Sequence, residues 1–468
     1  MREPSDFRDD AGDAQDVRDA HRPHDRAPAV SSGKHPHHLG FWMCVALVIG
    51  NTIGSGVFLL PLSLAPYGLN SVIAWLFVTS GVLMLAVVFA VLSRAFPKAG
   101  GPYAYVDLAF GPLPAFIVAW GYWISIWVGN VSIATGAISY LTPWMPWLAT
   151  LPGASAALTL AVLWILTAVN CYGIKAAGWV QSISTVLKVL PLIAVCGLGL
   201  TALDASHIQA LRNVQPLSLG GTTAAATLAL WAMLGIESAT IPAGKVRDPT
   251  RTIPRATLTG TIITALICML ACTTVLLLLG PKALATSNAP FADLAARHWG
   301  EGAGKLVALA AAISGFGALN GWILLQGELP NVMAKHGVFP RAFAQESARF
   351  TPTFALVFTS ALVSVLVLIN YQKSMGSIFT FMITLSTSAC LVLYLMCSLA
   401  LLRLLWTGYL GARGARAAAL ALLGALAAGF SVWALAGAGR EPFWWGVALL
   451  GCGVPIYAWM RRGVLSWG

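Results

Sequence analysis

The chain has 468 residues, of which 58% are hydrophobic and only 10% charged, and its mean hydropathy is +0.77. This composition excludes an ordinary soluble domain, and apolar stretches recur that are long enough to cross a ~30 Å hydrocarbon core at ~20 residues each. The net charge of +11 does not indicate nucleic-acid binding, because no basic stripe with interleaved aromatic residues lies on a soluble segment. We expect an all-α integral membrane protein.

Residues 1–38 differ from the rest, since Asp, Arg, His, Pro and Ala dominate and no apolar period occurs. Such a segment cannot bury a core and is expected to be a disordered tail. It lacks the apolar region of a signal peptide. A solvated tail is favoured over a metal site, because no Cys or acid spacing fixes a coordination geometry for its histidines, His21, His24, His35, His37 and His38. No metal or cofactor is expected elsewhere either.

Twelve apolar segments follow and predict twelve transmembrane helices. They lie near residues 41–65, 71–93, 114–140, 156–175, 182–203, 222–243, 256–280, 304–330, 353–370, 375–402, 416–437 and 442–460. Residues 39–462 are thus expected to form one membrane domain, and residues 463–468 a short C-terminal tail.

Basic residues concentrate in alternate loops, which the positive-inside rule assigns to the cytoplasm. Both termini should then be cytoplasmic. The loops carry Arg94, Lys98, Lys175, Lys245, Arg247, Arg251, Arg255, Lys335, Arg341, Arg349, Arg403, Arg413, Arg416, Arg461 and Arg462.

Two predicted spans, the first and the sixth, contain a glycine-rich break, at residues 50–56 and 235–238. Inside a bilayer an unwound backbone is tolerated only where it is buried in protein or lines a cavity, so these breaks predict the substrate site of a transporter. Their separation by five spans indicates a 5+5 inverted repeat. The first repeat covers about 41–203, the second about 222–402, and the helices near 416–460 are additions.

Six separated motifs occur in order along the chain: residues 50–61 (GNTIGSGVFLLP), 100–105 (GGPYAY), 122–130 (YWISIWVGN), 231–238 (WAMLGIES), 248–254 (DPTRTIP) and 321–322 (GW). In these motifs the chain resembles the amino acid, polyamine and organocation transporter superfamily, and within it the basic amino acid/polyamine antiporters. The resemblance spans about residues 38–462. It implies a LeuT-like fold, alternating access, a bacterial inner membrane and a homodimer.

The first break would expose backbone N–H groups at the start of a half-helix, where peptide dipoles favour a substrate carboxylate. The predicted residues are Asn51, Thr52, Ile53, Gly54, Ser55 and Gly56, with glycine allowing the ligand close approach and the Ser55 hydroxyl adding a donor. The alternative is that these glycines only pack helices closely.

The second break would leave carbonyl groups from Trp231 to Gly235, including Leu234, free for an α-ammonium group, with Trp231 as a lid over the ligand. By resemblance, Asn130, Trp322 and Ser386 select the substrate side chain, helped by freed carbonyls around Ser125 and Ile126. Trp322 offers a π face to a cation. The alternatives are a buried aromatic anchor for Trp322 and an interhelical hydrogen bond for Asn130.

The chain departs from the pattern of arginine/agmatine antiporters at three positions, where Ile126, Ile133 and Ala318 replace a cysteine, a methionine and a serine. These changes make the side-chain pocket less polar or differently shaped. Cationic substrates stay plausible, whereas arginine itself is put in doubt.

Glu237 lies in the sixth span, where a charged carboxylate would cost at least several kcal/mol, so it should be protonated part of the time and sense acid. By resemblance it forms an inner barrier with Tyr122 and Tyr394; the alternative is that it bonds backbone exposed by the break. Lys188, in the fifth span, is expected to snorkel to the cytoplasmic surface. Some sodium-independent relatives use a lysine in this span in place of sodium, which is the alternative.

The leading functional hypothesis is exchange of a basic amino acid for its decarboxylated amine, such as arginine for agmatine. The alternative is a proton-coupled permease or exchanger for another amino acid or polyamine, such as ornithine/putrescine, lysine/cadaverine or a neutral amino acid. An enzyme is not expected, because no nucleophile, base or metal set converges within the spans. A channel would need a continuous polar lining, and a receptor that does not transport stays open.

Overall fold

The computed structural model describes residues 40–97, 100–172, 174–240, 243, 246–348, 351–370 and 372–465, without the side chains of residues 55, 173–187 and 461–465. The chain divides into two units, residues 1–38 and 39–468. The predicted tail and its histidines lie outside the described residues.

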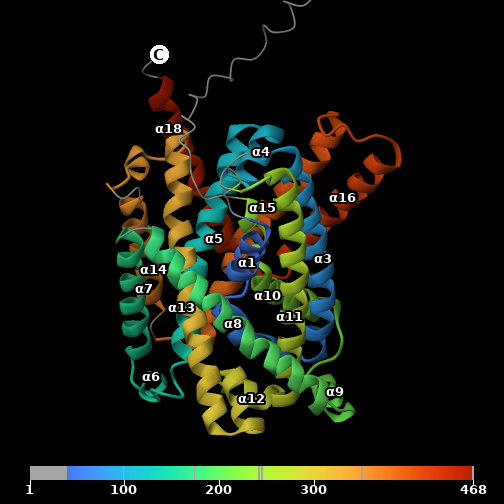
Figure 1. Cartoon of the computed structure of the whole chain (residues 1–468), viewed down its shortest axis with the longest axis vertical. Helices are drawn as coiled ribbons and strands as arrows, with labels where there is room; N and C mark the ends of the chain where they lie inside the picture. The colour runs from blue at the N-terminus through green and yellow to red at the C-terminus, as the bar shows by residue number, and fades with distance from the viewer. Residues whose placement is uncertain are drawn as a thin grey trace, which may run out of the picture. The chain divides into compact units, whose positions relative to one another are not determined.

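The second unit is built from helices (Figure 1). Its first part contains α1 (Phe41–Thr52), α2 (Ser55–Leu64), η1 (Ala65–Tyr67), α3 (Leu69–Ala95), α4 (Pro102–Phe110), α5 (Pro112–Ser139), α6 (Trp147–Thr150), α7 (Ala154–Tyr172), α8 (Ile174–Ala202) and α9 (Ala205–Arg212). Its second part contains α10 (Leu219–Leu230), η2 (Trp231–Met233), η3 (Ile236–Thr240), α11 (Pro249–Leu284), α12 (Pro290–Trp299), α13 (Glu301–Lys335), η5 (Arg341–Ala344), α14 (Thr353–Ile369), α15 (Met375–Trp406), α16 (Gly414–Ala436), α17 (Arg440–Gly451) and α18 (Gly453–Leu465).

Nine segments among the described residues are long and apolar enough to cross a membrane, and eleven if each of two bent helix pairs counts as one span. One bent pair is α1 with α2, and the other joins the end of α8 to α9. α14 is apolar but shorter. The expectation of an all-α, multi-span membrane protein is confirmed, whereas the count of twelve stays a prediction.

The predicted break in the first span lies between α1 and α2, whose axes differ by 42°. Ile53 and Gly54 connect them in extended conformations. The break in the sixth span is shorter than predicted, because Trp231–Met233 forms a 3₁₀ turn and only Leu234 and Gly235 leave the helical region.

The two breaks touch each other. Gly235 has φ +106°, which favours glycine, and a Cβ atom at this position would lie 3.2 Å from the carbonyl carbon of Asn51. Glycine at this position therefore avoids both a strained backbone and a tight contact where the two interrupted helices meet.

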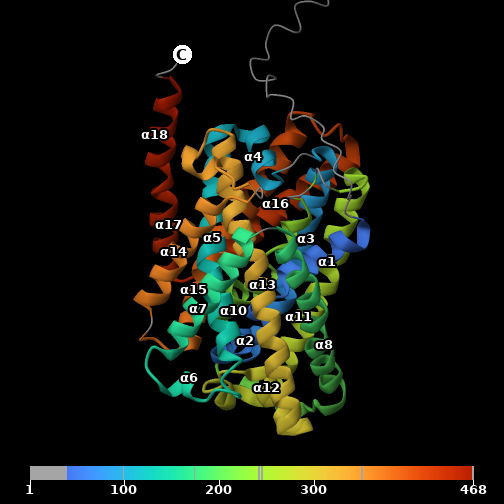
Figure 2. The same cartoon turned by 60° about the vertical axis from the view of Figure 1, so that its left-hand side comes forward.

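α5 lies at the centre of the helical unit and packs against α13, α15 and α2 (Figures 1 and 2). In its apolar 18-residue stretch, 94% of the residues are buried. By contrast, only 28% of the corresponding residues are buried in α16, and only 17% in the segment Arg440–Met460. The last helices therefore lie at the periphery, away from the breaks.

Candidate functional site

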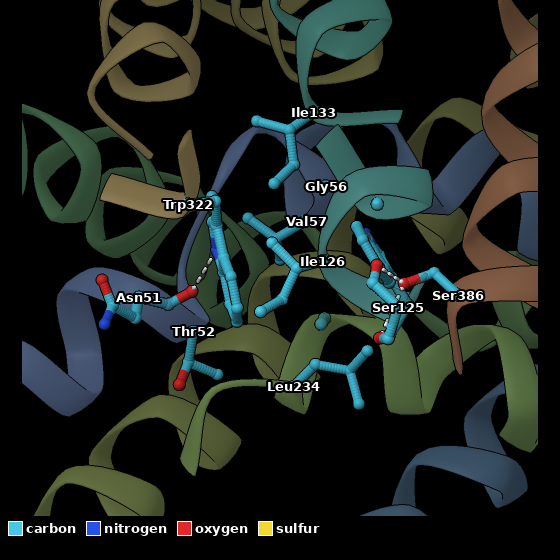
Figure 3. Close-up of a pocket in the computed structure, with 14 residues that line it drawn as sticks. Asn51, Thr52, Gly56, Val57, Ser125, Ile126, Ile133, Leu234, Trp322 and Ser386 are labelled. Atoms are coloured by element: carbon cyan, nitrogen blue, oxygen red, sulfur yellow. Dashed lines mark hydrogen bonds between the residues drawn. The ribbon is translucent and has the colours of Figure 1, made fainter. Parts of the chain in front are cut away.

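Both breaks open onto one cavity, whose walls come from α1, α2, α5, the sixth-span break, α13 and α15 (Figure 3). The lining residues are Asn51, Thr52, Gly54, Gly56, Val57, Ser125, Ile126, Gly129, Ile133, Trp231, Ala232, Leu234, Trp322 and Ser386. Most of the predicted substrate-binding residues are therefore brought together around one space, and none of the lining side chains is charged.

Among the described residues, three predicted binding residues are absent from this lining: Ile53, Asn130 and Gly235. The side chain of Ser55 lies outside what the structure describes. The Ile53 N–H donates to Ile49 O at 2.8 Å, so it completes α1. The prediction that this N–H is exposed for a carboxylate is therefore wrong.

Val57 and Gly129 line the cavity although the sequence did not mark them, whereas Ile133 and Ala232 lie in stretches that it did consider. A signal was present for Gly129. Gly129 and Ile133 lie three and seven residues after Ile126, so all three share one face of α5.

The N-terminus of α2 forms the polar end of the cavity. α2 begins at Ser55, and its N-cap residue is Gly54, which has no side chain to cap the helix. Gly54, Gly56 and Val57 line the cavity. The N–H groups of a first helical turn have no intrahelical acceptor, and the aligned peptide dipoles give them partial positive charge. The geometry can thus accept an anionic group, and the carboxylate site stays a prediction.

The indole of Trp231 packs between two glycines. A Cβ atom at Gly56 would lie 2.2 Å from Trp231 Nε1, and one at Gly129 would lie 2.7 Å from the far edge of the same ring. Glycine at these positions therefore makes room for Trp231, which covers one side of the cavity. For Gly56 this is a different reason from the close ligand approach predicted from the sequence.

Fewer carbonyl groups of the sixth-span break are free to bind a ligand than the sequence predicted. Trp231 O accepts from Leu234 N at 3.2 Å, and Gly235 O accepts from Ser238 N at 3.0 Å. The carbonyl groups that could bind an ammonium group are therefore those between Trp231 and Gly235, where Ala232 and Leu234 line the cavity.

Trp322 is a buried aromatic anchor that also lines the cavity. Its Nε1 donates to Asn51 O at 3.2 Å, which fixes α13 to the last turn of α1, and its ring lines the cavity (Figure 3). The anchoring bond uses the ring edge and leaves the π face free of it.

Freed carbonyls around Ser125 and Ile126 are not found. α5 runs without interruption from Pro112 to Ser139, and Ser386 Oγ donates to Ser125 O at 2.6 Å while lying 3.1 Å from Ser125 Oγ. The prediction is wrong because α15 supplies a hydroxyl that bonds this carbonyl. Ser125 and Ser386 line the cavity as a bonded pair (Figure 3).

Asn130 is fully buried and bonds another helix. Its Nδ2 donates to Gln326 Oε1 on α13 at 2.7 Å. The interhelical hydrogen bond considered for Asn130 is therefore present, and Gln326 is a partner that the sequence did not single out.

Glu237 is fully buried and bonded by both predicted tyrosines. Tyr122 on α5 donates to Oε1 at 2.7 Å, and Tyr394 on α15 donates to Oε2 at 2.9 Å. The three side chains join α5, the sixth-span break and α15, in the arrangement that the sequence predicted.

Lys188 does not snorkel to the surface. It is fully buried, and its Nζ donates to Gly50 O at 2.6 Å. The prediction is wrong because α8 passes beside the broken end of α1, where a carbonyl in the last helical turn has no partner within its own helix. Among the described residues no acid forms an ion pair with Lys188.

A second cavity is lined by Arg94 at the end of α3 and by Thr250, Arg251, Pro254 and Arg255 at the start of α11, two basic segments that the sequence assigns to the cytoplasm. Three guanidinium groups would repel a cation. The cavity between the breaks is thus the better candidate for a cationic substrate. Among the described residues, no group of His, Cys, Asp and Glu side chains could hold a metal ion.

Comparison with known proteins supports the membrane-transport assignment. A family model described as amino acid permease matches residues 39–460. A putative arginine/ornithine antiporter of Bacillus subtilis is 33% identical over 401 residues, which cover 79% of this chain and 85% of that protein.

A cadaverine/lysine antiporter of Escherichia coli (strain K12) is 31% identical over 344 residues, covering 72% of this chain and 76% of that protein. A putrescine transporter of Haemophilus influenzae is 27% identical over 432 residues, covering 92% and 97% respectively. The chain therefore belongs to the amino acid permease family of the amino acid, polyamine and organocation superfamily, whose members are membrane transporters and not enzymes.

Proposed function

We propose that the chain exchanges a basic amino acid for its decarboxylated amine, as arginine for agmatine, or for a second basic amino acid, by alternating access across a bacterial inner membrane. The observation that carries this proposal is the uncharged cavity at the meeting point of the two breaks, with the first turn of α2 at one end and the Trp322 ring in its wall.

In this proposal the substrate carboxylate lies against the N–H groups of α2, and its α-ammonium group lies against the carbonyls near Ala232 and Leu234. The side-chain cation faces Trp322, an interaction worth roughly 0.5–2 kcal/mol depending on desolvation. Trp231 covers the bound molecule.

The cavity-lining residues include no acid, which suits an exchanger. A fixed carboxylate would form a buried ion pair with the substrate cation, and breaking such a pair is costly. A π face and neutral dipoles bind the cation more weakly, so the substrate is released on the opposite side of the membrane.

Three similar proteins have names that specify arginine, ornithine, lysine, cadaverine or putrescine, all of which carry a cationic amine or guanidinium. These names support a cationic substrate for this chain. An amine lacks the carboxylate that would bind α2, whereas a second basic amino acid keeps it, so the choice of counter-substrate is a separate question.

We also propose twelve spans arranged as two inverted five-helix repeats with two additional helices, cytoplasmic termini, and a homodimer. Protons are proposed to act through Glu237. The positive-inside distribution supports the topology, and the resemblance supports the repeat and the dimer.

Counterflow in proteoliposomes tests the function. Labelled arginine is offered outside vesicles loaded with agmatine, arginine, ornithine, lysine, cadaverine, putrescine, a neutral amino acid or nothing, at acidic and neutral pH. We expect uptake only against internal cationic substrates. Label accumulation in empty vesicles would contradict obligatory exchange, and a protein that binds substrate without accumulating label would be a receptor.

A second candidate is a permease for neutral amino acids, which the apolar side chains of Ile126 and Ile133 in the cavity wall favour. In the same experiment it predicts equal or faster counterflow of a labelled neutral amino acid. Absence of arginine uptake under every loading would favour this candidate.

A further inference from the structure

Four buried polar side chains form one hydrogen-bonded chain through α5, α13, α14 and α7. Asn130 Nδ2 donates to Gln326 Oε1 at 2.7 Å, and Gln326 Nε2 donates to Ser360 Oγ at 2.8 Å. Ser360 Oγ lies 2.7 Å from Thr167 Oγ1. Each of the four side chains is at most 1% exposed, so the chain is shielded from solvent.

The direction of this chain is fixed at its far end. Thr167 has one hydroxyl proton, which it donates to Leu163 O at 2.8 Å. Thr167 Oγ1 must then accept the Ser360 proton, because a hydroxyl has one donor. Ser360 Oγ accepts in turn from Gln326 Nε2, so Gln326 turns its carbonyl oxygen towards Asn130.

The reverse direction loses a hydrogen bond. If both amides were turned around, Ser360 would have to donate to Gln326 and accept from Thr167. The Thr167 proton would then leave Leu163 O, and two acceptor oxygens would face each other at 2.8 Å. The hydrogen bonds of these four side chains therefore select one orientation of the Asn130 amide. The oxygen and nitrogen of an amide are told apart by the partners that they bond.

Because Gln326 accepts the hydrogen bond from the NH₂ group of Asn130, the Asn130 side-chain carbonyl oxygen has no part in this network. Asn130 Oδ1 is buried, and no donor among the described residues reaches it. Asn130 follows Gly129 and lies between Ile126 and Ile133 on one face of α5, and these three neighbours line the cavity. A buried acceptor is thus held beside the wall of the substrate cavity.

We propose that Gln326 is a positioning residue that presents the Asn130 carbonyl oxygen as a hydrogen-bond acceptor for the cationic N–H groups of the substrate. The proposal rests on the proposed function and deepens it. An ammonium or guanidinium group can donate to this oxygen, whereas the apolar side chain of a neutral isostere cannot. Gln326 thereby contributes selectivity without touching the substrate.

Binding to the purified full-length protein tests the proposal. Affinities are measured for arginine, lysine and ornithine, and for norleucine and norvaline as neutral analogues of the last two. We expect Gln326→Leu to weaken cationic substrates on the order of tenfold, because a hydrogen bond to a charged group is lost, and to leave neutral analogues unchanged. Ser360→Ala should shift the same ratio less, since it frees Gln326 to turn.

A double-mutant cycle separates positioning from a general loss of structure. If Gln326 acts through Asn130, then Gln326→Leu should not change the cationic-to-neutral ratio further in an Asn130→Ala background. Ser364→Ala is the matched control, because Ser364 lies on α14 one turn from Ser360, and its hydroxyl donates to the Ser360 backbone carbonyl outside the chain.

The outcomes are distinguishable. Equal weakening of cationic and neutral ligands by Gln326→Leu, or an undiminished effect in the Asn130→Ala background, would overturn the role of Gln326 and leave the proposed function intact. A wild-type protein that binds neutral analogues as well as cations would overturn the proposed function, and this inference with it.

Discussion

At the residue scale, the bonds to Glu237 depend on the protonation of its carboxyl group. An ionised carboxylate only accepts, and it can hold both the Tyr122 and the Tyr394 hydroxyl groups at the distances found here. Hydrogen bonds to a charged group contribute about 1.5–3 kcal/mol, against about 0.5–1.5 kcal/mol for neutral pairs. Protonation would weaken both bonds and turn one carboxyl oxygen into a donor. The link that Glu237 makes between α5 and α15 should therefore loosen in acid.

Glu237→Gln tests this link. The amide keeps the size of the side chain and can still bond both tyrosines, but it does not titrate. We expect uptake by the wild-type protein to rise as the pH falls, and uptake by the variant to be nearly independent of pH. Counterflow rates at a series of pH values measure this.

Tyr394→Phe is the control, because it removes one bond to Glu237 and keeps the titrating group. It should therefore retain a pH response. A Glu237→Gln variant with the full wild-type response would exclude Glu237 as the acid sensor.

At the element scale, the first broken helix is held by neighbours that bond its interrupted end. Lys188 of α8 and Trp322 of α13 donate to the carbonyls of Gly50 and Asn51, which belong to the last turn of α1. The end of α1 is thus fixed relative to α8 and α13.

Lys188→Met tests the first of these ties. Methionine has a similar length but no donor, so the Gly50 carbonyl loses a buried partner, at a cost of about 1–3 kcal/mol. We expect a lower melting temperature in detergent and weaker substrate binding. Lys188→Gln, which keeps an N–H donor, should recover part of both.

Unchanged stability and binding in Lys188→Met would show that this bond does not hold α1 in place. A loss in Lys188→Gln as large as in Lys188→Met would indicate that the positive charge matters more than the hydrogen bond.

At the scale of the whole molecule, the basic loops predict the orientation of the chain in the membrane. Arg413 lies in the loop between α15 and α16 and is exposed, and Gly302 lies at the start of α13 with open space around a Cβ atom. The first position is expected in the cytoplasm and the second outside.

Cysteine labelling measures this orientation. In a Cys452→Ser background, which removes the exposed native thiol, Gly302→Cys should react with a membrane-impermeant maleimide in spheroplasts, and Arg413→Cys should react only after permeabilisation. The reverse pattern would invert the topology and place the basic loops outside.

The sequence by itself determined the features that depend on local composition. Hydropathy placed the spans, and glycine clusters placed the two breaks, because an interrupted helix in a bilayer needs residues such as Gly54 and Gly235 at the interruption itself. The motifs also identified the family and the cluster of Tyr122, Glu237 and Tyr394.

Only the tertiary structure decided which polar groups meet. The partners of Asn130, Ser125 and Lys188 lie on helices distant in sequence, so neither period nor spacing could indicate them. The physical reason is that a buried donor or acceptor must find a partner wherever packing brings one. That requirement placed Ser386 against the carbonyl expected to be free, buried Lys188 at the end of α1, and paired Asn130 with Gln326.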